Sequence, residues 1–264
     1  MNDGQLSGAW NFRDIAATTG IRPARFFRSS ELSGLNDAGR DAFTRLGITD
    51  VADLRSPQEL ERRGAGAVPD GVAVHLLPFP ELSNTSAAAP HENSWQKMMT
   101  EQVPDDEVEA ATDRFMTGEY ESFPVLGGAK RAVRQVFSLL GADRPVITHC
   151  FAGKDRTGFT VAVVLETIGV QRDAILTDYL RSNDAVGSLR ERIMESVTSH
   201  AGETPEITSF AEARLTDGVL GVREDYLASS MRVIEENYGD LKGFVRACEV
   251  TDEDIAKARA ALLG

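Results

Sequence analysis

Residues 145–168 read PVITHCFAGKDRTGFTVAVVLETI and are the most informative part of this sequence. Residues 145–148 form a short apolar run with β-branched side chains, which predicts a buried strand. Residues 157–168 are long enough for a helix, and Gly169 follows as a helix stop. The segment between them, 149–158, contains two glycines and reads as a turn. The stretch therefore predicts a strand, a turn and a helix in immediate succession.

Cys150 and Arg156 bracket five residues of this turn, which gives the spacing C-x5-R. A helix N-terminus presents unpaired backbone N–H groups and the positive end of the helix dipole, so it attracts anions. A loop of this length can wrap its amides around one tetrahedral oxyanion, and the guanidinium of Arg156 can add two parallel hydrogen bonds. The phosphate-binding residues that this predicts are Phe151, Ala152, Gly153, Lys154, Asp155, Arg156 and Thr157.

A cysteine at a helix N-terminus favours its thiolate form, which is the nucleophilic form. We expect the Cys150 thiolate to attack phosphorus and form a phosphocysteine, which water then hydrolyses. Arg156 and the loop amides are expected to hold the equatorial oxygens more tightly as charge develops. Thr157 is placed to donate a hydrogen bond to the sulfur. This chemistry requires neither a metal ion nor a cofactor.

The proton donor for the leaving oxygen has several candidates at this stage. Asp155 lies inside the loop, Glu81 follows the sequence PFP, and Asp105 and Asp106 lie in a later acidic stretch. Lys154 adds a positive charge beside the expected pocket, where it could serve a second phosphate or an acidic neighbour on the substrate.

Short apolar runs alternate with helical segments through the first half of the chain. Strands are expected near 25–28, 48–56, 72–80 and 145–148, and helices at 36–46 and 127–140. Asn36 or Asp37 can cap the first of these helices. This alternation predicts an α/β fold with a mainly parallel central sheet flanked by helices. The chain after Gly169 reads as helical, and its last helix opens with a capping-box pattern at Thr251 to Asp254. We find neither an internal repeat nor a linker, so a single domain over 1–264 is expected.

Residues 83–117 form a long excursion from this pattern, with helical character after Asp105. Loops of this length without secondary structure are uncommon and are often functional, although a tolerated surface insertion explains the segment equally well.

The net charge is −13, from 28 basic and 41 acidic residues, which argues against binding to nucleic acid or to an anionic membrane surface. Two cysteines and four scattered histidines indicate neither a disulfide framework nor a metal site. The N-terminus does not resemble a signal peptide, and no apolar run is long enough to span or anchor in a bilayer. A cytoplasmic location is expected, and export without a signal peptide stays open. The sequence does not predict an oligomeric state.

The motifs around the loop resemble those of a known family, the atypical bacterial tyrosine phosphatases that carry an HC-x-AGKDRTG loop. The resemblance extends over nearly the full length. It is carried by HCFAGKDRTG, GAWNFRD (8–14), FRSSELS (27–33), LGITDVADLRS (46–56), VHLLPFP (74–80), DYLRSND (178–184) and ARLTDGVLGVRE (213–224).

The resemblance implies a phosphatase fold that acts on phosphotyrosine, with phosphoserine, phosphothreonine and phosphoinositides as further substrates. It implies that Cys150 is the nucleophile, that Arg156 binds phosphate and that Asp155 is a proposed acid. It also associates Lys154 with lipid-phosphatase activity, and it implies a two-helix lid within about 186–215. Glu81 departs from the family pattern, because the relatives have aspartate there.

Two alternatives use similar loops. Rhodanese-type sulfurtransferases and arsenate reductases also present a cysteine on an anion-binding loop, but a mid-chain cysteine and the Arg156–Thr157 pair argue against both. A catalytically silent phosphate-binding protein is the third hypothesis, and the presence of Cys150, Asp155 and Arg156 argues against it.

Overall fold

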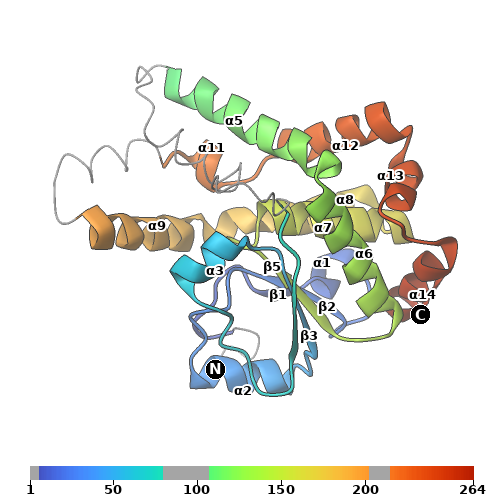
Figure 1. Ribbon diagram of the computed structural model, residues 1–264, viewed down its shortest axis with the longest axis horizontal. Helices are drawn as coiled ribbons and strands as arrows, with labels where there is room; N and C mark the ends of the chain where they lie inside the picture. The colour runs from blue at the N-terminus through green and yellow to red at the C-terminus, as the bar shows by residue number, and fades with distance from the viewer. Residues whose placement is uncertain (1–5, 80–106, 202–214) are drawn as a thin grey trace.

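The computed structural model describes residues 6–79, 107–201 and 215–264. Its sheet has five strands in the order β1-β2-β5-β3-β4, and helices are arranged around this sheet (Figure 1). The strands are β1 (Arg13–Asp14), β2 (Phe26–Ser29), β3 (Asp50–Asp53), β4 (Ala73–Leu76) and β5 (Val146–His149). Four of them are parallel, and only β1 pairs antiparallel, with β2. The expected α/β fold with a mainly parallel sheet is confirmed, and β5 occupies the centre of the sheet.

Helices precede and follow β5 in the described residues. Before it lie α1 (Ala16–Thr19), α2 (Asp37–Arg45), α3 (Pro57–Arg63), α5 (Val108–Ser122), the 3-10 turn η2 (Phe123–Val125) and α6 (Gly127–Gly141). After it lie α7 (Asp155–Ile168), α8 (Arg172–Leu180), the 3-10 turn η3 (Arg181–Ala185), α9 (Val186–Ala201), α11 (Asp217–Leu220), α12 (Glu224–Tyr238), α13 (Leu241–Ala247) and α14 (Asp252–Leu263). The expected helix-rich C-terminal half is present.

The inner strands β2, β3 and β5 are buried on both faces of the sheet. Successive side chains of a strand point to opposite faces, so each of these strands contributes to two cores. Phe26 and Val146 belong to the larger apolar core, which the C-terminal helices complete. Their neighbours Phe27 and Ile147 belong to a smaller core that includes Phe43 of α2. In the central strand β5 this double coverage explains why Val146 and Ile147 form a continuous apolar run instead of an alternating pattern.

Two predicted caps are confirmed. Asn36 accepts a hydrogen bond from the Gly39 amide at 3.0 Å and starts α2. Thr251 and Asp254 form the reciprocal capping box that starts α14. The loop helix α7 begins at Asp155, two residues earlier than expected. The short strand β1 has no apolar pattern, and sequence analysis did not foresee it.

The predicted lid and excursion are only partly covered by the described residues. Helix α9 matches the first part of the range 186–215, whereas 202–214 lies outside the described residues. Helix α5 occupies the end of the excursion, and 83–106 lies outside the described residues, as do Glu81, Asp105 and Asp106. Within the described ranges, no helix combines the length and apolar character that crossing a bilayer requires.

Candidate active site

The loop that carries Cys150 leaves the carboxyl end of β5 and enters α7, as the sequence predicted. Cys150 itself is 2% exposed. Gly153 has a φ of +67°, and a Cβ atom there would lie 2.0 Å from the carbonyl oxygen of Ser29. Glycine is therefore required at this position, both for the left-handed backbone and for the close packing of the loop against the end of β2.

Two side chains hold the loop through its carbonyl groups. Asn11 Nδ2 donates to the Ala152 and Gly153 oxygens at 3.0 and 3.1 Å. Arg28 Nη2 donates to the Gly153 oxygen at 2.8 Å and to the Lys154 oxygen at 3.2 Å. In a trans peptide the N–H points opposite to the C=O, so the amides that follow these carbonyls point away from Asn11 and Arg28. That orientation leaves them for an anion on the other side of the loop.

Arg28 is fixed in turn by a buried carboxylate that sequence analysis missed. Asp178 of α8 accepts from Arg28 Nη1 and from Arg13 Nε, each at 2.7 Å. Burial opposes ionisation of Asp178, but the charges of Arg28 and Arg13 outweigh it and lower its pKa. Breaking such a pair leaves an uncompensated buried charge, so this triad anchors the underside of the loop.

Arg156 is oriented by Glu59 of α3. Its Nη1 and Nη2 donate to Glu59 Oε2 and Oε1, both at 2.7 Å, and Nη1 also donates to the Leu54 oxygen at 3.3 Å. Burial disfavours the charge of Arg156, but the Glu59 carboxylate outweighs it and raises the pKa of the guanidinium. Glu59 is itself fixed, because it forms the capping box of α3 with Ser56.

These contacts leave one edge of the Arg156 guanidinium for a ligand. A guanidinium has five N–H groups, and Glu59 and Leu54 accept three of them. The remaining two, on Nε and Nη2, are parallel and form the edge that binds phosphate in a bidentate way. No partner for this edge is found among the described residues.

His149 and Thr157 flank the loop. His149 is fully buried, and its Nδ1 lies 3.1 Å from the Cys150 oxygen, so Nδ1 carries the proton and donates to this acceptor. Burial lowers the pKa of His149, although Asp53 opposes this change, and the ring orients the loop as a neutral donor. The Thr157 hydroxyl is buried and has no hydrogen-bond partner in the described part of the chain, so its donation to sulfur stays a prediction.

Lys154, the residue before Asp155 in the loop, is buried, at 5% exposure. Its Nζ donates to the oxygens of Val219 and Gly221 at 2.7 and 2.9 Å. The ammonium group is thus directed to these two carbonyls, and a contact between Lys154 and the substrate stays a prediction. Lys154 ties the loop to α11 and the residue that follows it.

The family follows from a comparison of sequences. The sequence model of the tyrosine phosphatase family matches residues 4–264. The chain belongs to the tyrosine phosphatase family. The resemblance noted from its motifs is thereby confirmed, and the family assignment favours a phosphatase over the sulfurtransferase and arsenate reductase alternatives.

Three relatives support this assignment. The triple specificity protein phosphatase PtpB of Mycobacterium tuberculosis is 52% identical over 272 residues, which cover 98% of this chain and 99% of the relative. A putative tyrosine-protein phosphatase of Cupriavidus necator is 27% identical, over 94% of this chain and 84% of the relative. A tyrosine-protein phosphatase of Nostoc commune is 28% identical, over 92% and 76% respectively.

Glu119 of α5 is a second acidic residue of this tyrosine phosphatase site, and sequence analysis did not single it out. It is half-buried, and burial raises its pKa to about 7. The charge of Arg156 opposes this increase and that of Asp155 adds to it. Its proximity to both loop residues depends on how α5 packs, and nothing in the local sequence GEYES indicates that packing.

Replacing Glu119 with glutamine is expected to increase stability at alkaline pH. Folding raises the pKa of Glu119 from 4.5 to about 7. Between pH 4.5 and about pH 7, the folded state therefore keeps a proton that the unfolded state has released. Stability therefore falls as pH rises through this window, and Glu119→Gln removes the loss. We expect the free energy of unfolding at pH 8 to exceed that of the wild type by roughly 1–3 kcal/mol, and the two to converge near pH 4.5.

Denaturant unfolding across pH measures this difference. The control is Glu121→Gln. Glu121 lies two positions after Glu119 on α5, and its carboxylate pairs with Arg232 of α12. An equal pH dependence in Glu119→Gln and in the wild type would contradict the assignment.

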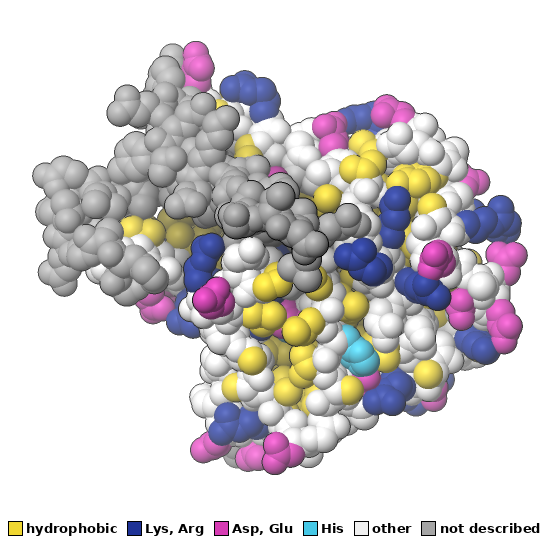
Figure 2. Space-filling model, in the orientation of Figure 1, with side chains coloured by type: hydrophobic (Ala, Val, Ile, Leu, Met, Phe, Trp, Pro, Cys, Tyr) yellow, Lys and Arg dark blue, Asp and Glu magenta, His cyan; other side chains and the backbone are white. Residues whose placement is uncertain are grey.

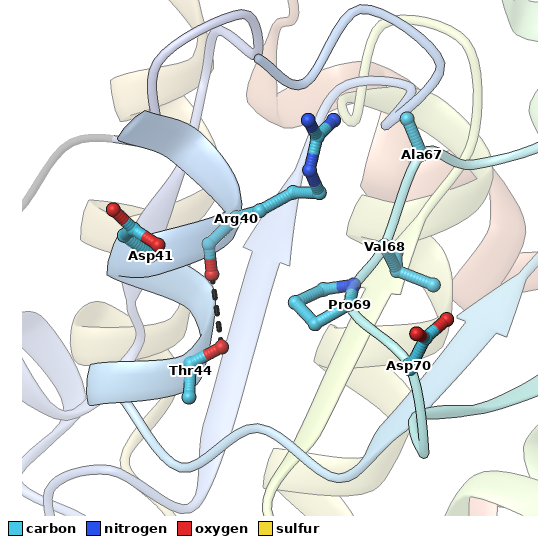
Figure 3. A pocket seen from close by; sticks show the side chains of 7 residues that line it. All are labelled: Arg40, Asp41, Thr44, Ala67, Val68, Pro69 and Asp70. Atoms are coloured by element: carbon cyan, nitrogen blue, oxygen red, sulfur yellow. Dashed lines mark hydrogen bonds between the residues drawn. The ribbon is translucent and has the colours of Figure 1, made fainter. Parts of the chain in front are cut away.

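A pocket elsewhere in the phosphatase contains none of the expected site residues. It has a volume of about 460 Å3 and lies between α2 and the segment that leads to β4 (Figure 3). Arg40, Asp41 and Thr44 line one side, and residues 67–70 line the other.

Basic and acidic side chains are interspersed on the face in Figure 2, so no basic patch for an anionic surface is visible there. No group of three or more metal-ligating side chains is found among the described residues.

Proposed function

We propose that this tyrosine phosphatase hydrolyses phosphate monoesters through a phosphocysteine at Cys150, without a metal ion. The observation that carries the proposal is the Nε–Nη2 edge of Arg156, which has no partner among the described residues and belongs to a guanidinium held by Glu59 on the loop that begins at Cys150. The loop amides add further donors, since their carbonyls are turned toward Asn11 and Arg28. Together these groups supply a local positive field in a protein of net charge −13.

The first step transfers the phosphoryl group. The Cys150 thiolate attacks phosphorus in line, an S–P bond forms and the P–O bond to the leaving group breaks. Asp155 is the proposed acid, because its carboxyl lies in the loop with 25% of its side chain exposed. Its proton passes to the leaving oxygen, and Arg156 stabilises the charge on the equatorial oxygens.

The second step restores the enzyme. Asp155, now ionised, accepts a proton from water as the water oxygen attacks phosphorus. The P–S bond breaks, inorganic phosphate forms and the Cys150 thiolate is regenerated. Thr157 supports this step by donating a hydrogen bond from its hydroxyl to the departing sulfur, which leaves as the thiolate.

We propose that the substrates are phosphotyrosine, phosphoserine or phosphothreonine in proteins, and phosphoinositides. The 52% identity to a phosphatase named for triple specificity supports this range. Lys154 contributes to all three activities by holding the loop against the Val219 and Gly221 carbonyls, without contacting a second phosphate.

Lys154→Ala is therefore expected to lower kcat/KM for all three substrate classes alike, by about tenfold, because a displaced loop misplaces the reacting groups. The measurement is phosphate release from a phosphotyrosine peptide, a phosphothreonine peptide and a soluble phosphoinositide. Lys242→Ala, at an exposed lysine of α13, is the matched control and should resemble the wild type. A loss confined to the phosphoinositide would show direct contact with Lys154, and phosphate release from none of the three by the wild type would overturn the proposed function.

A further inference from the structure

Two buried tyrosines connect α5 and α8 to the loop of this phosphatase. Tyr179 donates its hydroxyl proton to the Tyr120 oxygen at 2.6 Å, and Tyr120 donates to Asp155 Oδ1 at 3.0 Å. Both residues are almost fully buried, and their rings meet edge to face at 6.4 Å between centroids. The direction of donation is set by Asp155, because an ionised carboxylate can only accept hydrogen bonds. Tyr120 must therefore donate to Asp155, and its oxygen accepts from Tyr179.

Both tyrosines remain donors throughout the neutral pH range. Burial, together with the nearby Asp155 charge, raises the pKa of Tyr120 and of Tyr179 well above the usual value for a phenol. A donor that itself accepts a hydrogen bond is polarised by it, so Tyr179 strengthens the bond from Tyr120 to Asp155.

We call the hydrogen-bonded series Tyr179–Tyr120–Asp155 the tyrosine relay, and packing fixes it in place. A Cβ atom on Gly158 would lie 2.8 Å from the Tyr179 ring, so this ring rests on the backbone of the first turn of α7. The Tyr120 backbone is held from α12, because Ser230 Oγ donates to its carbonyl oxygen at 2.7 Å. The two hydroxyls thus have little freedom relative to Asp155.

The two oxygens of Asp155 are in different environments. Oδ1 accepts from Tyr120 and also lies 3.3 Å from Lys154 Nζ. Oδ2 has no hydrogen-bond partner among the described residues. A proton on Asp155 therefore belongs on Oδ2, since protonation of Oδ1 would bring it against two donors.

We infer that Tyr120, supported by Tyr179, is a positioning residue that holds Asp155 through Oδ1 and presents the proton of Oδ2 to the leaving group. The inference rests on the proposed function, in which Asp155 is the general acid. It adds a role for side chains that touch neither the phosphoryl group nor the nucleophile.

Tyr120→Phe tests the inference with two substrates. A phosphotyrosine peptide needs a proton on its leaving oxygen, whereas an aryl phosphate with a strongly acidic phenol leaves without one. We expect kcat for the peptide to fall about tenfold, the size of one charge-assisted hydrogen bond, and kcat for the activated aryl phosphate to change less than about twofold.

The pH profile provides a readout that a purely structural role would not move. Tyr120→Phe removes one of the donors to Asp155 Oδ1, and we expect the alkaline limb of kcat for the peptide to move to higher pH. Other groups near Asp155 are unchanged in the variant. They are Glu119 of α5, Lys154 and Arg156 of the loop, Tyr179 of α8 and Tyr226 of α12.

Tyr226→Phe is the matched control. Tyr226 belongs to the same aromatic cluster, with its ring centroid 5.8 Å from that of Tyr120, but its hydroxyl donates to Asp113. In this variant, the ratio of kcat for the peptide to kcat for the activated aryl phosphate should equal that of the wild type. The alkaline limb of the pH profile of kcat for the peptide should also be unchanged. Tyr179→Phe should change both quantities in the direction of Tyr120→Phe, by a smaller amount.

Asp155→Asn separates the inference from the proposed function. Wild-type peptide turnover in Asp155→Asn would overturn the acid assignment itself. If Asp155→Asn loses peptide turnover while Tyr120→Phe keeps the wild-type substrate ratio and pH profile, the acid assignment stands and the tyrosine relay is overturned. The relay is also overturned if Tyr120→Phe lowers kcat for both substrates equally while Tyr179→Phe keeps the wild-type kcat values.

Discussion

Cys150→Ser is expected to abolish turnover, with kcat falling by on the order of 10⁵-fold or more. A serine hydroxyl in place of the thiol is not ionised near neutral pH, so the loop would retain its phosphate donors but lose its nucleophile. Phosphate release from a phosphotyrosine peptide measures the loss. Calorimetric binding of inorganic phosphate should persist, because the loop amides, Arg156 and Glu59 are unchanged.

The other cysteine provides the matched control. Cys248 is buried at the end of α13, and burial raises its pKa to about 12, so it stays a neutral thiol. Cys248→Ala should keep kcat close to the wild-type value, with some loss of stability from the vacated volume. Substantial turnover in Cys150→Ser would contradict the assignment of the nucleophile.

Arg156→Lys is expected to lower kcat/KM by about 10³-fold although it preserves the positive charge. Lysine cannot reproduce the two parallel donors of the Nε–Nη2 edge, nor the paired bonds to Glu59. Because charge neutralisation in the transition state depends on that edge, kcat should fall more than KM rises.

Glu59→Gln distinguishes orientation of Arg156 from its direct contact with phosphate. It keeps the guanidinium and the side-chain length at position 59 but removes the carboxylate, and we expect a smaller loss, about tenfold in kcat/KM. Both variants are measured with the same phosphotyrosine peptide. If Arg156→Lys were as active as the wild type, Arg156 would act only as a charge, and the bidentate account would be wrong.

The central strand, the loop and its helix could be predicted because their signals are local. An apolar β-branched run, a C-x5-R spacing and a helix-length segment lie within 145–168. The caps at Asn36 and Thr251 are equally local, since each cap bonds a residue three positions on.

The supports of the site could not be predicted because their partners are distant in sequence. Arg156 and Glu59 are 97 residues apart, and Arg28 and Asp178 are 150 apart. Tyr120 reaches Asp155 from α5, which packs beside α12 in the finished fold (Figure 1). Pattern and propensity report which face of an element is apolar, and they carry no information about which distant polar group meets it.

Lys154 is another residue whose partners are distant in sequence and could not be predicted. Its position beside the phosphate loop suggested a substrate contact, because a lysine is usually exposed unless it is paired. The carbonyls of Val219 and Gly221 satisfy its ammonium group more than sixty residues away, and only the folded structure brings them to the loop.

Rapid-quench trapping of the phosphorylated enzyme tests whether Cys150 is the covalent nucleophile. Wild-type protein and Asp155→Asn are mixed with an activated aryl phosphate, quenched rapidly in acid, digested and analysed by mass spectrometry. We expect one phosphoryl group on the peptide that contains Cys150, with more of it in Asp155→Asn, because water attack is slowed while the leaving group departs unaided. Rapid turnover with no phosphorylated Cys150 peptide at any quench time, or with the phosphoryl group on another residue, would contradict it.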